Sequence, residues 1–128
     1  MMKEVGINDS AEAYALYAGR EPLPEKAVDA ATRYVGSDRY PATVIGDPDS
    51  DAVFGVQDDD DRVISGSMQN GSAKYAYYRN ESAPISLYRR RNGRFEQVVF
   101  NYETNRYNKV GVGGLYIGER DRYYDPHF

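Results

Sequence analysis

The sequence predicts an α+β fold in which two short N-terminal helices precede an antiparallel β-meander of six or seven strands. Apolar residues recur at helical spacing before residue 36 and at a period of two after residue 38. Clusters of turn-forming residues then separate the apolar runs. Asn70-Gly71 and Asn92-Gly93 are the dipeptides that tight antiparallel hairpins prefer. These observations favour a meander over a parallel sheet.

The helices are predicted over 9–19 and 24–35. Asp9 begins a capping box for the first helix. Pro24 suits the first position of the second helix, and Gly36 suits its left-handed end. Both helices are too short to be stable alone, so we expect them to cover one face of the sheet.

The strands should pack on the helices, or close into a barrel or sandwich, within a single domain of residues 1–128. We expect residues 119–128 to form a C-terminal tail. The sequence Asp47-Pro48-Asp49-Ser50 is an ordinary turn cluster. The predicted strands are 41–46, 52–57, 62–69, 73–79, 85–91, 94–103 and 109–117.

Composition excludes some classes of site and location. The chain of 128 residues has no cysteine, so disulfides and thiolate metal sites are excluded. We expect no signal peptide and no membrane span, because no apolar run has the required length. The expected location is the cytoplasm or a viral particle.

Charge is unevenly distributed along the chain. Residues 1–64 contain fourteen acidic and six basic side chains, whereas residues 65–128 contain six acidic and ten basic ones. Such asymmetry indicates a charged partner or a complementary copy of the same chain, unless the fold interleaves the two halves.

The acidic half contains a predicted interaction patch. Four consecutive aspartates are expected at a solvated hairpin tip, where their charge would deter edge pairing. Two alternatives stay open: a decoy that imitates a phosphate backbone, and a calcium or magnesium site at Asp47, Asp49 and Asp51. The calcium-loop pattern is broken because Ala52 stands where glycine is required. The patch comprises Asp47, Asp49, Asp51, Asp58, Asp59, Asp60 and Asp61.

The basic half contains a predicted basic and aromatic patch. Arginine and tyrosine are enriched at protein interfaces. The same combination binds single-stranded nucleic acid, although the acidic chain argues against that partner. A third interpretation is purely structural: the arginine stems cover apolar strand edges, and the tyrosines pack with their hydroxyls in water. The patch comprises Arg89, Arg90, Arg91, Arg94, Tyr78 and Tyr88.

Catalytic groups are scarce. The one histidine, His127, is next to the C-terminus, and no serine lies in a nucleophile motif. Glu96 and Glu103 could serve a small phosphodiester hydrolase, but their spacing does not favour it. We expect no cofactor and no enzymatic activity.

The predicted function is therefore protein interaction or assembly. Head-to-tail contacts between the acidic patch of one copy and the basic patch of the next would form rings or tubes, as in a small viral particle. The alternative is an acidic decoy or adaptor that inhibits a nucleic-acid-binding protein.

Overall fold

The computed structural model describes residues 19–67, 72–111 and 113–124, which form nine β-strands and no helix. Seven strands form one antiparallel sheet in the order β8-β7-β6-β3-β2-β1-β9, and β4 pairs with β5 in a second sheet. The predicted α+β class is therefore wrong. The strands are β1 (Lys26–Val35), β2 (Asp38–Ile45), β3 (Phe54–Asp58), β4 (Asp60–Ser65), β5 (Lys74–Tyr78), β6 (Ile85–Arg91), β7 (Arg94–Asn101), β8 (Arg106–Lys109) and β9 (Gly114–Glu119).

The segment predicted as a second helix, 24–35, is mostly β1. This strand pairs with β2 on one side and with β9 on the other. Three consecutive residues, Ala30 to Thr32, are buried, as in a strand covered on both faces. Val28, from the predicted helical stripe, is 94% exposed. The first predicted helix, 9–19, lies outside the described residues apart from Gly19.

Six of the predicted strands overlap β2 to β7. The hairpin at Asn92-Gly93 is confirmed, because both residues have positive φ angles (54° and 76°) and Arg91 pairs with Arg94. The Asn70-Gly71 turn lies outside the described residues, but the flanking strands β4 and β5 pair as antiparallel neighbours.

The predicted strand 109–117 is divided between β8 and β9. Gly113 lies in the connection, where a β-carbon would be 2.2 Å from the backbone oxygen of Tyr34. The glycines therefore end one strand and bring the chain close to β1, where β9 begins.

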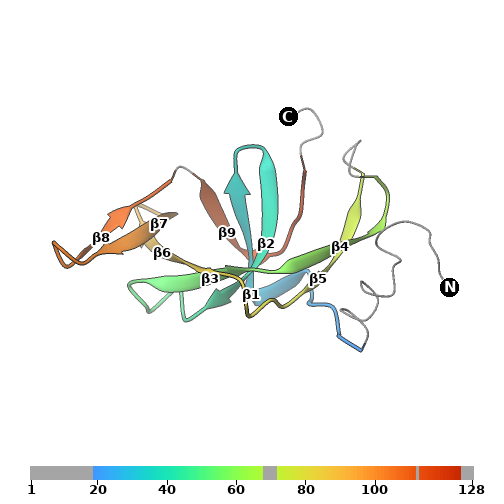
Figure 1. Ribbon diagram of the computed structural model, residues 1–128, viewed down its shortest axis with the longest axis horizontal. Helices are drawn as coiled ribbons and strands as arrows, with labels where there is room; N and C mark the ends of the chain where they lie inside the picture. Colours follow the sequence, from blue (N-terminus) through green and yellow to red (C-terminus); the bar gives the residue numbers. More distant parts are fainter. Residues whose placement is uncertain (1–18, 68–71, 112, 125–128) are drawn as a thin grey trace.

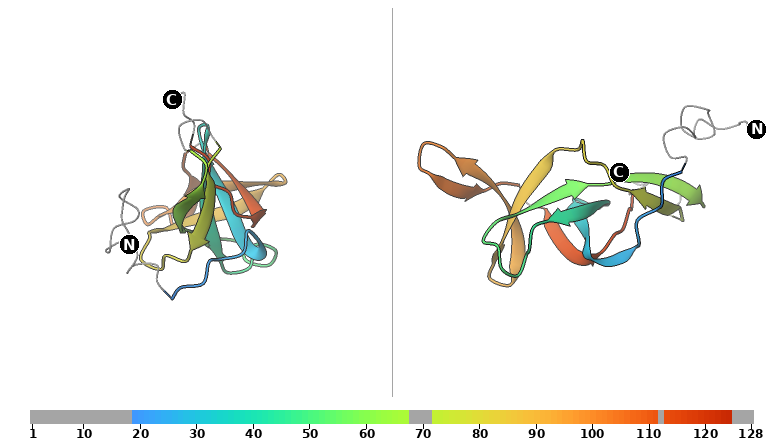
Figure 2. Two further views of the ribbon diagram at one scale, coloured as in Figure 1. Left: turned by 90° about the vertical axis from the view of Figure 1, so that its right-hand side faces the viewer. Right: turned by 90° about the horizontal axis from the view of Figure 1, so that it is seen from below.

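The large sheet curls on itself (Figures 1 and 2). Its β9 end approaches β7. The β7–β8 hairpin, called the arm below, projects at one end of the molecule, and the β4–β5 sheet lies at the other (Figure 1).

The core fills the concave side of this sheet. Small residues on β1 and β2 allow larger side chains from β3 and β6 to pack against them. Phe54 lies against Tyr88 and meets Phe95 edge-on, with centroids 6.5 and 5.6 Å away. The buried cluster is Ala31, Ala42, Val44, Phe54, Val56 and Tyr88, with Phe95, Leu115 and Ile117 packed against it.

The residues after β9 return to the sheet. Arg120 is buried, and Tyr123 forms an antiparallel bridge with Arg39. Residues 120–124 therefore pack on the sheet and belong to the fold. None of them forms a helix of the length and apolar character needed to cross a membrane.

Candidate ligand-binding clefts

The aspartates Asp58–Asp61 lie along β3, β4 and the residue between them, so the predicted hairpin tip is wrong. Asp59 marks the point where the chain leaves the large sheet for the small one. Since side chains alternate along a strand, the four carboxylates do not share one surface. Three of them form ion pairs within the chain, with Arg33, Arg120 and Arg122.

Asp58 and Asp61 are partly exposed members of this group. Arg33 donates to both oxygens of Asp58, from Nε at 2.6 Å and Nη2 at 2.7 Å. This fork raises the pKa of Arg33 above its ordinary value. Burial raises the pKa of Asp61, and the guanidinium of Arg122, 3.5 Å away, opposes that shift.

The side chain of Asp59 is fully removed from solvent. Its Oδ1 accepts from Thr43 Oγ1 at 2.7 Å, and its Oδ2 accepts from Arg120 Nε at 2.8 Å. Arg120 also donates to Thr43 Oγ1 and to the carbonyl of Pro24. Burial raises the pKa of Asp59, against the opposing hydrogen bonds from Thr43 and Arg120.

The other predicted acidic residues lie in the β2–β3 loop. Asp51 Oδ2 accepts from the amide of Asp47, whose own oxygens accept from Asp49 and Ser50. The bond from the Asp49 amide lowers the pKa of Asp47. The carboxylates thus cap their own turn. No group of three or more acidic or imidazole side chains among residues 19–67, 72–111 and 113–124 is placed to hold a metal.

The predicted basic and aromatic residues do not form one surface. Tyr88 belongs to the core, and Tyr78 is buried below the guanidinium of Arg20, 5.3 Å from its ring centroid. Arg90 lies on the same side of β6 as Tyr88, with its guanidinium 4.6 Å from the Phe95 centroid. Its Nη2 contacts Asp49 at 3.4 Å, so the acidic loop meets this arginine within one chain.

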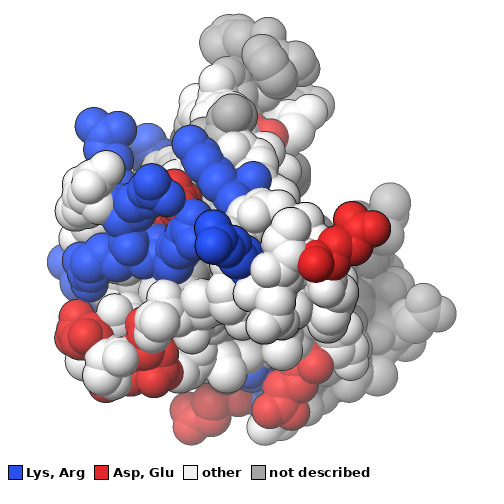
Figure 3. Space-filling view, turned by 90° about the vertical axis from the view of Figure 1, so that its left-hand side faces the viewer, with Lys and Arg blue, Asp and Glu red and all other residues white. Residues whose placement is uncertain are grey.

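Arg89 and Arg91 face the opposite side of β6 and converge on Glu96. Arg89 Nε donates to Glu96 Oε2 at 2.8 Å, and Arg91 Nη1 lies 3.9 Å from the same oxygen. Arg94 and Lys109 lie beside them and form no ion pair with any residue that the structure describes. Figure 3 shows Lys and Arg side chains gathered over this end of the molecule.

A basic cleft of about 850 Å³ opens among these groups. One carboxylate, Glu96, lies among several cations, and Arg89 already binds it, so a positive charge remains at the cleft. Clefts lined by charge of one sign concentrate ligands of the opposite sign. Its lining is Arg91, Asn92, Arg94, Glu96, Lys109, Gly113 and Gly114.

An apolar cleft of about 790 Å³ adjoins the basic cleft. Val44, Phe95, Leu115 and Ile117 contribute its apolar surface, which continues from the core. Arg94 and Gly114 line both clefts. The two clefts therefore meet at the β6–β7 hairpin and the start of β9. Charged residues also line the apolar cleft, namely Asp29, Asp47, Asp49, Arg90 and Arg94.

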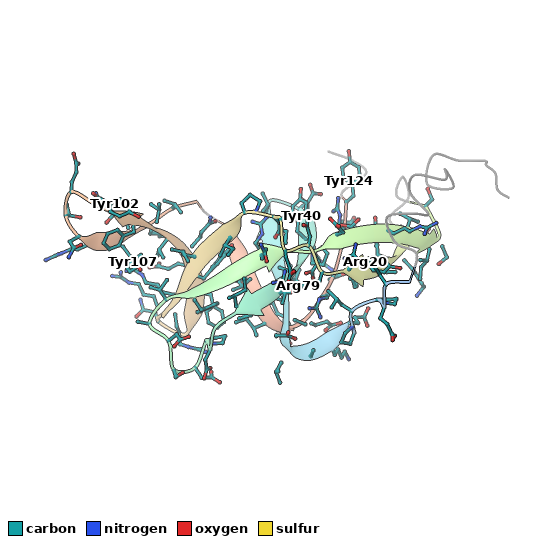
Figure 4. The ribbon with its side chains drawn as sticks, turned by 60° about the horizontal axis from the view of Figure 1, so that its bottom comes forward. Arg20, Tyr40, Arg79, Tyr102, Tyr107 and Tyr124 are labelled. Atoms are coloured by element: carbon teal, nitrogen blue, oxygen red, sulfur yellow. The ribbon has the colours of Figure 1, made fainter. Side chains whose placement is uncertain are left out.

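An exposed aromatic cluster extends along the arm (Figure 4). The ring of Phe100 meets those of Tyr102 and Tyr107 edge-on, at 4.8 and 5.0 Å. Tyr102 is 87% exposed. Figure 4 places both tyrosines on the arm, away from Arg20 and Tyr124.

The groups considered for hydrolysis are not shown together. Glu96 is held by Arg89, whereas Glu103 lies in the β7–β8 turn, where its amide donates to Asn101 Oδ1. His127 lies outside the described residues. The described residues of the two clefts place several cations beside apolar side chains.

Sequence reasoning identified the arginines of β6 and β7 but missed Lys109, Gly114 and the apolar residues opposite them. The sequence predicts a strand over 109–117, but nothing local shows which strand lies across the cleft. The sequence predicts a tail from residue 119, and no nearby signal indicates that Arg120 pairs with Asp59.

Comparisons with known proteins returned no matching family model, no similar curated protein and no similar solved structure. The predicted viral, assembly and decoy roles therefore stay predictions.

Proposed function

We propose that this domain is a non-enzymatic interaction module whose basic cleft binds an acidic segment of a partner protein. The observation that carries the proposal is the cationic surplus of the basic cleft: Arg94 and Lys109 form no ion pair with a described residue, and Arg91 shares Glu96 with Arg89. Elsewhere in the described chain, Arg33, Arg39, Arg120 and Arg122 are paired with carboxylates of the same fold, whereas Lys26, Lys74 and Arg106 form no ion pair with a described residue but line neither cleft.

The cleft suits reversible recognition. Its charges lie at an open surface, where they accelerate encounter and favour the correct partner more than they add affinity. Binding through these groups should weaken as salt rises, because the Debye length falls to about 8 Å at physiological ionic strength.

Charge reversal at the cleft tests the proposal. The probe is a fluorescein-labelled peptide of alternating Asp and Glu, measured by anisotropy at low and moderate salt. The double variant Arg94→Glu/Lys109→Glu should bind about tenfold more weakly, since each exposed charge pair contributes up to about 1 kcal/mol. The double variant Lys26→Glu/Lys74→Glu is the matched control, because it makes the same charge change outside both clefts. Equal weakening in the two double variants would contradict a specific cleft.

A further inference from the structure

The apolar cleft exposes hydrocarbon that the fold itself does not cover. Val28 is 94% exposed and Tyr116 is 53% exposed, and both line this cleft together with core-facing Leu115 and Ile117. Apolar side chains that gather in a concavity, beside charged residues, are typical of a binding surface. Ile64 on β4 is also exposed (63%), but it lines neither of the two clefts.

The junction between the clefts is open at Gly114. A β-carbon built there meets no heavy atom within 4 Å, so the backbone leaves space in front of it. Arg94 lines the same junction from the β6–β7 hairpin. In an extended peptide, side chains two positions apart are separated by about 7 Å. One short segment can therefore reach both clefts.

The charges of the apolar cleft indicate what it accepts. Asp29, Asp47 and Asp49 repel a carboxylate from the apolar cleft, whereas the cations of the basic cleft attract one. Arg90 lies over Phe95 and contacts Asp49, whose carboxylate partly neutralises the charge of the guanidinium. An uncharged aliphatic or aromatic side chain fits this combination.

We propose that the apolar cleft is a second subsite, and that the partner is an acidic segment carrying one large apolar side chain. The acidic residues bind at Arg91, Arg94 and Lys109, and the apolar side chain enters beside Phe95, Leu115 and Ile117. This inference rests on the proposed function, because it assigns the remainder of the same ligand.

Two peptides test the second subsite. The first is Asp-Glu-Asp-Phe-Asp-Glu, and the second has Ser in place of Phe, each labelled with fluorescein. The native chain should bind the Phe peptide about tenfold more tightly, because one large apolar side chain leaves water. Equal affinities would overturn the second subsite and leave the proposed function intact. Failure to bind either peptide, even at low salt, would overturn the proposed function itself.

Variants locate the effect. Gly114→Leu fills the junction, and Val28→Asp adds charge to the apolar cleft; Ile64→Asp is the matched control for Val28→Asp on another strand. The first two should reduce the preference for Phe to less than twofold and leave folding unchanged by circular dichroism. Ile64→Asp should keep the preference. Preservation of the preference in both Gly114→Leu and Val28→Asp would overturn the location.

Other occupants give different results. A twelve-residue oligothymidylate can be compared with the unlabelled Phe peptide as a competitor for the labelled Phe peptide. If the oligothymidylate displaces the labelled peptide at the lower concentration, the assignment to a protein partner is overturned. Self-association of the native chain that Val28→Asp abolishes would assign the apolar cleft to a second copy and overturn the proposal.

Discussion

Arg120 donates from Nε to Oδ2 of Asp59 at 2.8 Å, and the two side chains are 1% and 0% exposed. The pair connects the residue where the chain changes sheets with the first residue after β9. Thr43 donates to one partner and accepts from the other, so the buried polar atoms satisfy each other. This contact holds the end of β9 in place. Because β9 forms one wall of both clefts, the contact also stabilises that wall.

Removing one member of this pair should be costly. Arg120→Ala leaves Asp59 buried without a cation, which typically lowers the free energy of unfolding by about 3–5 kcal/mol. Urea denaturation followed by circular dichroism measures the change. Arg39→Ala, which removes the exposed ion pair with Asp121, is the control and should cost less than about 1 kcal/mol. Similar losses in both variants would mean that burial of the Asp59 pair contributes little.

Replacing the whole network should cost less than breaking it. In Asp59→Leu/Thr43→Val/Arg120→Met no buried carboxylate or guanidinium remains, so the loss should be smaller than for Arg120→Ala. The loss in Arg120→Ala should also shrink as pH falls. Burial already raises the pKa of Asp59 in the native chain, and loss of the Arg120 hydrogen bond and charge would raise it further, so protonation at low pH relieves more of the cost in the variant. A loss in Arg120→Ala that is constant with pH would contradict this reasoning.

Two adjacent glycines should respond differently to the same substitution. Gly113→Ala places a β-carbon 2.2 Å from the backbone oxygen of Tyr34, so the connection to β9 must shift. We expect a loss of about 1–3 kcal/mol in urea denaturation, the usual range for overpacking. Gly114→Ala meets no atom within 4 Å and should be near neutral. Equal stabilities would contradict the close approach of β9 to β1.

Local chemistry predicted several features correctly. The Asn92-Gly93 turn requires two positive φ angles, which the sequence supplies by itself, and the bounds of β6 were predicted correctly as 85–91. The helix assigned to 24–35 failed because that segment fits two periodicities. The segment forms a strand because it pairs with β9, which is distant in the sequence; Arg33 of β1 pairs with Leu115 of β9.

The candidate site was predictable only in part for the same reason. The arginines of β6 were visible in the sequence, but alternation places Arg89 and Arg91 in the basic region and Arg90 beside the core ring of Phe95. The sequence predicts a solvated turn at the aspartate run because the arginines that pair with these aspartates are remote in the sequence. Arg120 is 61 positions from Asp59, and no sequence pattern links them.

Stability should fall at alkaline pH. Burial raises the pKa of Tyr77, Tyr88 and Tyr75 above the ordinary value of about 10. The folded chain therefore keeps these protons where the unfolded chain releases them, so the free energy of unfolding decreases as pH rises above about 10. Urea midpoints between pH 8 and 11 measure the slope. Tyr77→Phe should reduce it, with Tyr102→Phe as the control for loss of one phenol on the exposed arm.

The state of association distinguishes self-assembly from binding to another protein. Head-to-tail assembly needs an acidic surface, but Asp58, Asp59 and Asp61 are paired within the chain, and Asp49 contacts Arg90 of the same molecule. We therefore expect a monomer by light scattering behind size exclusion, at low and at high salt. A defined oligomer that dissociates in salt, and that Arg89→Glu/Arg90→Glu/Arg91→Glu prevents, would contradict this expectation. In that case the acidic segment bound by the basic cleft would belong to a second copy, and the exposed loop at Asp47, Asp49 and Asp51 would be the first segment to test by substitution.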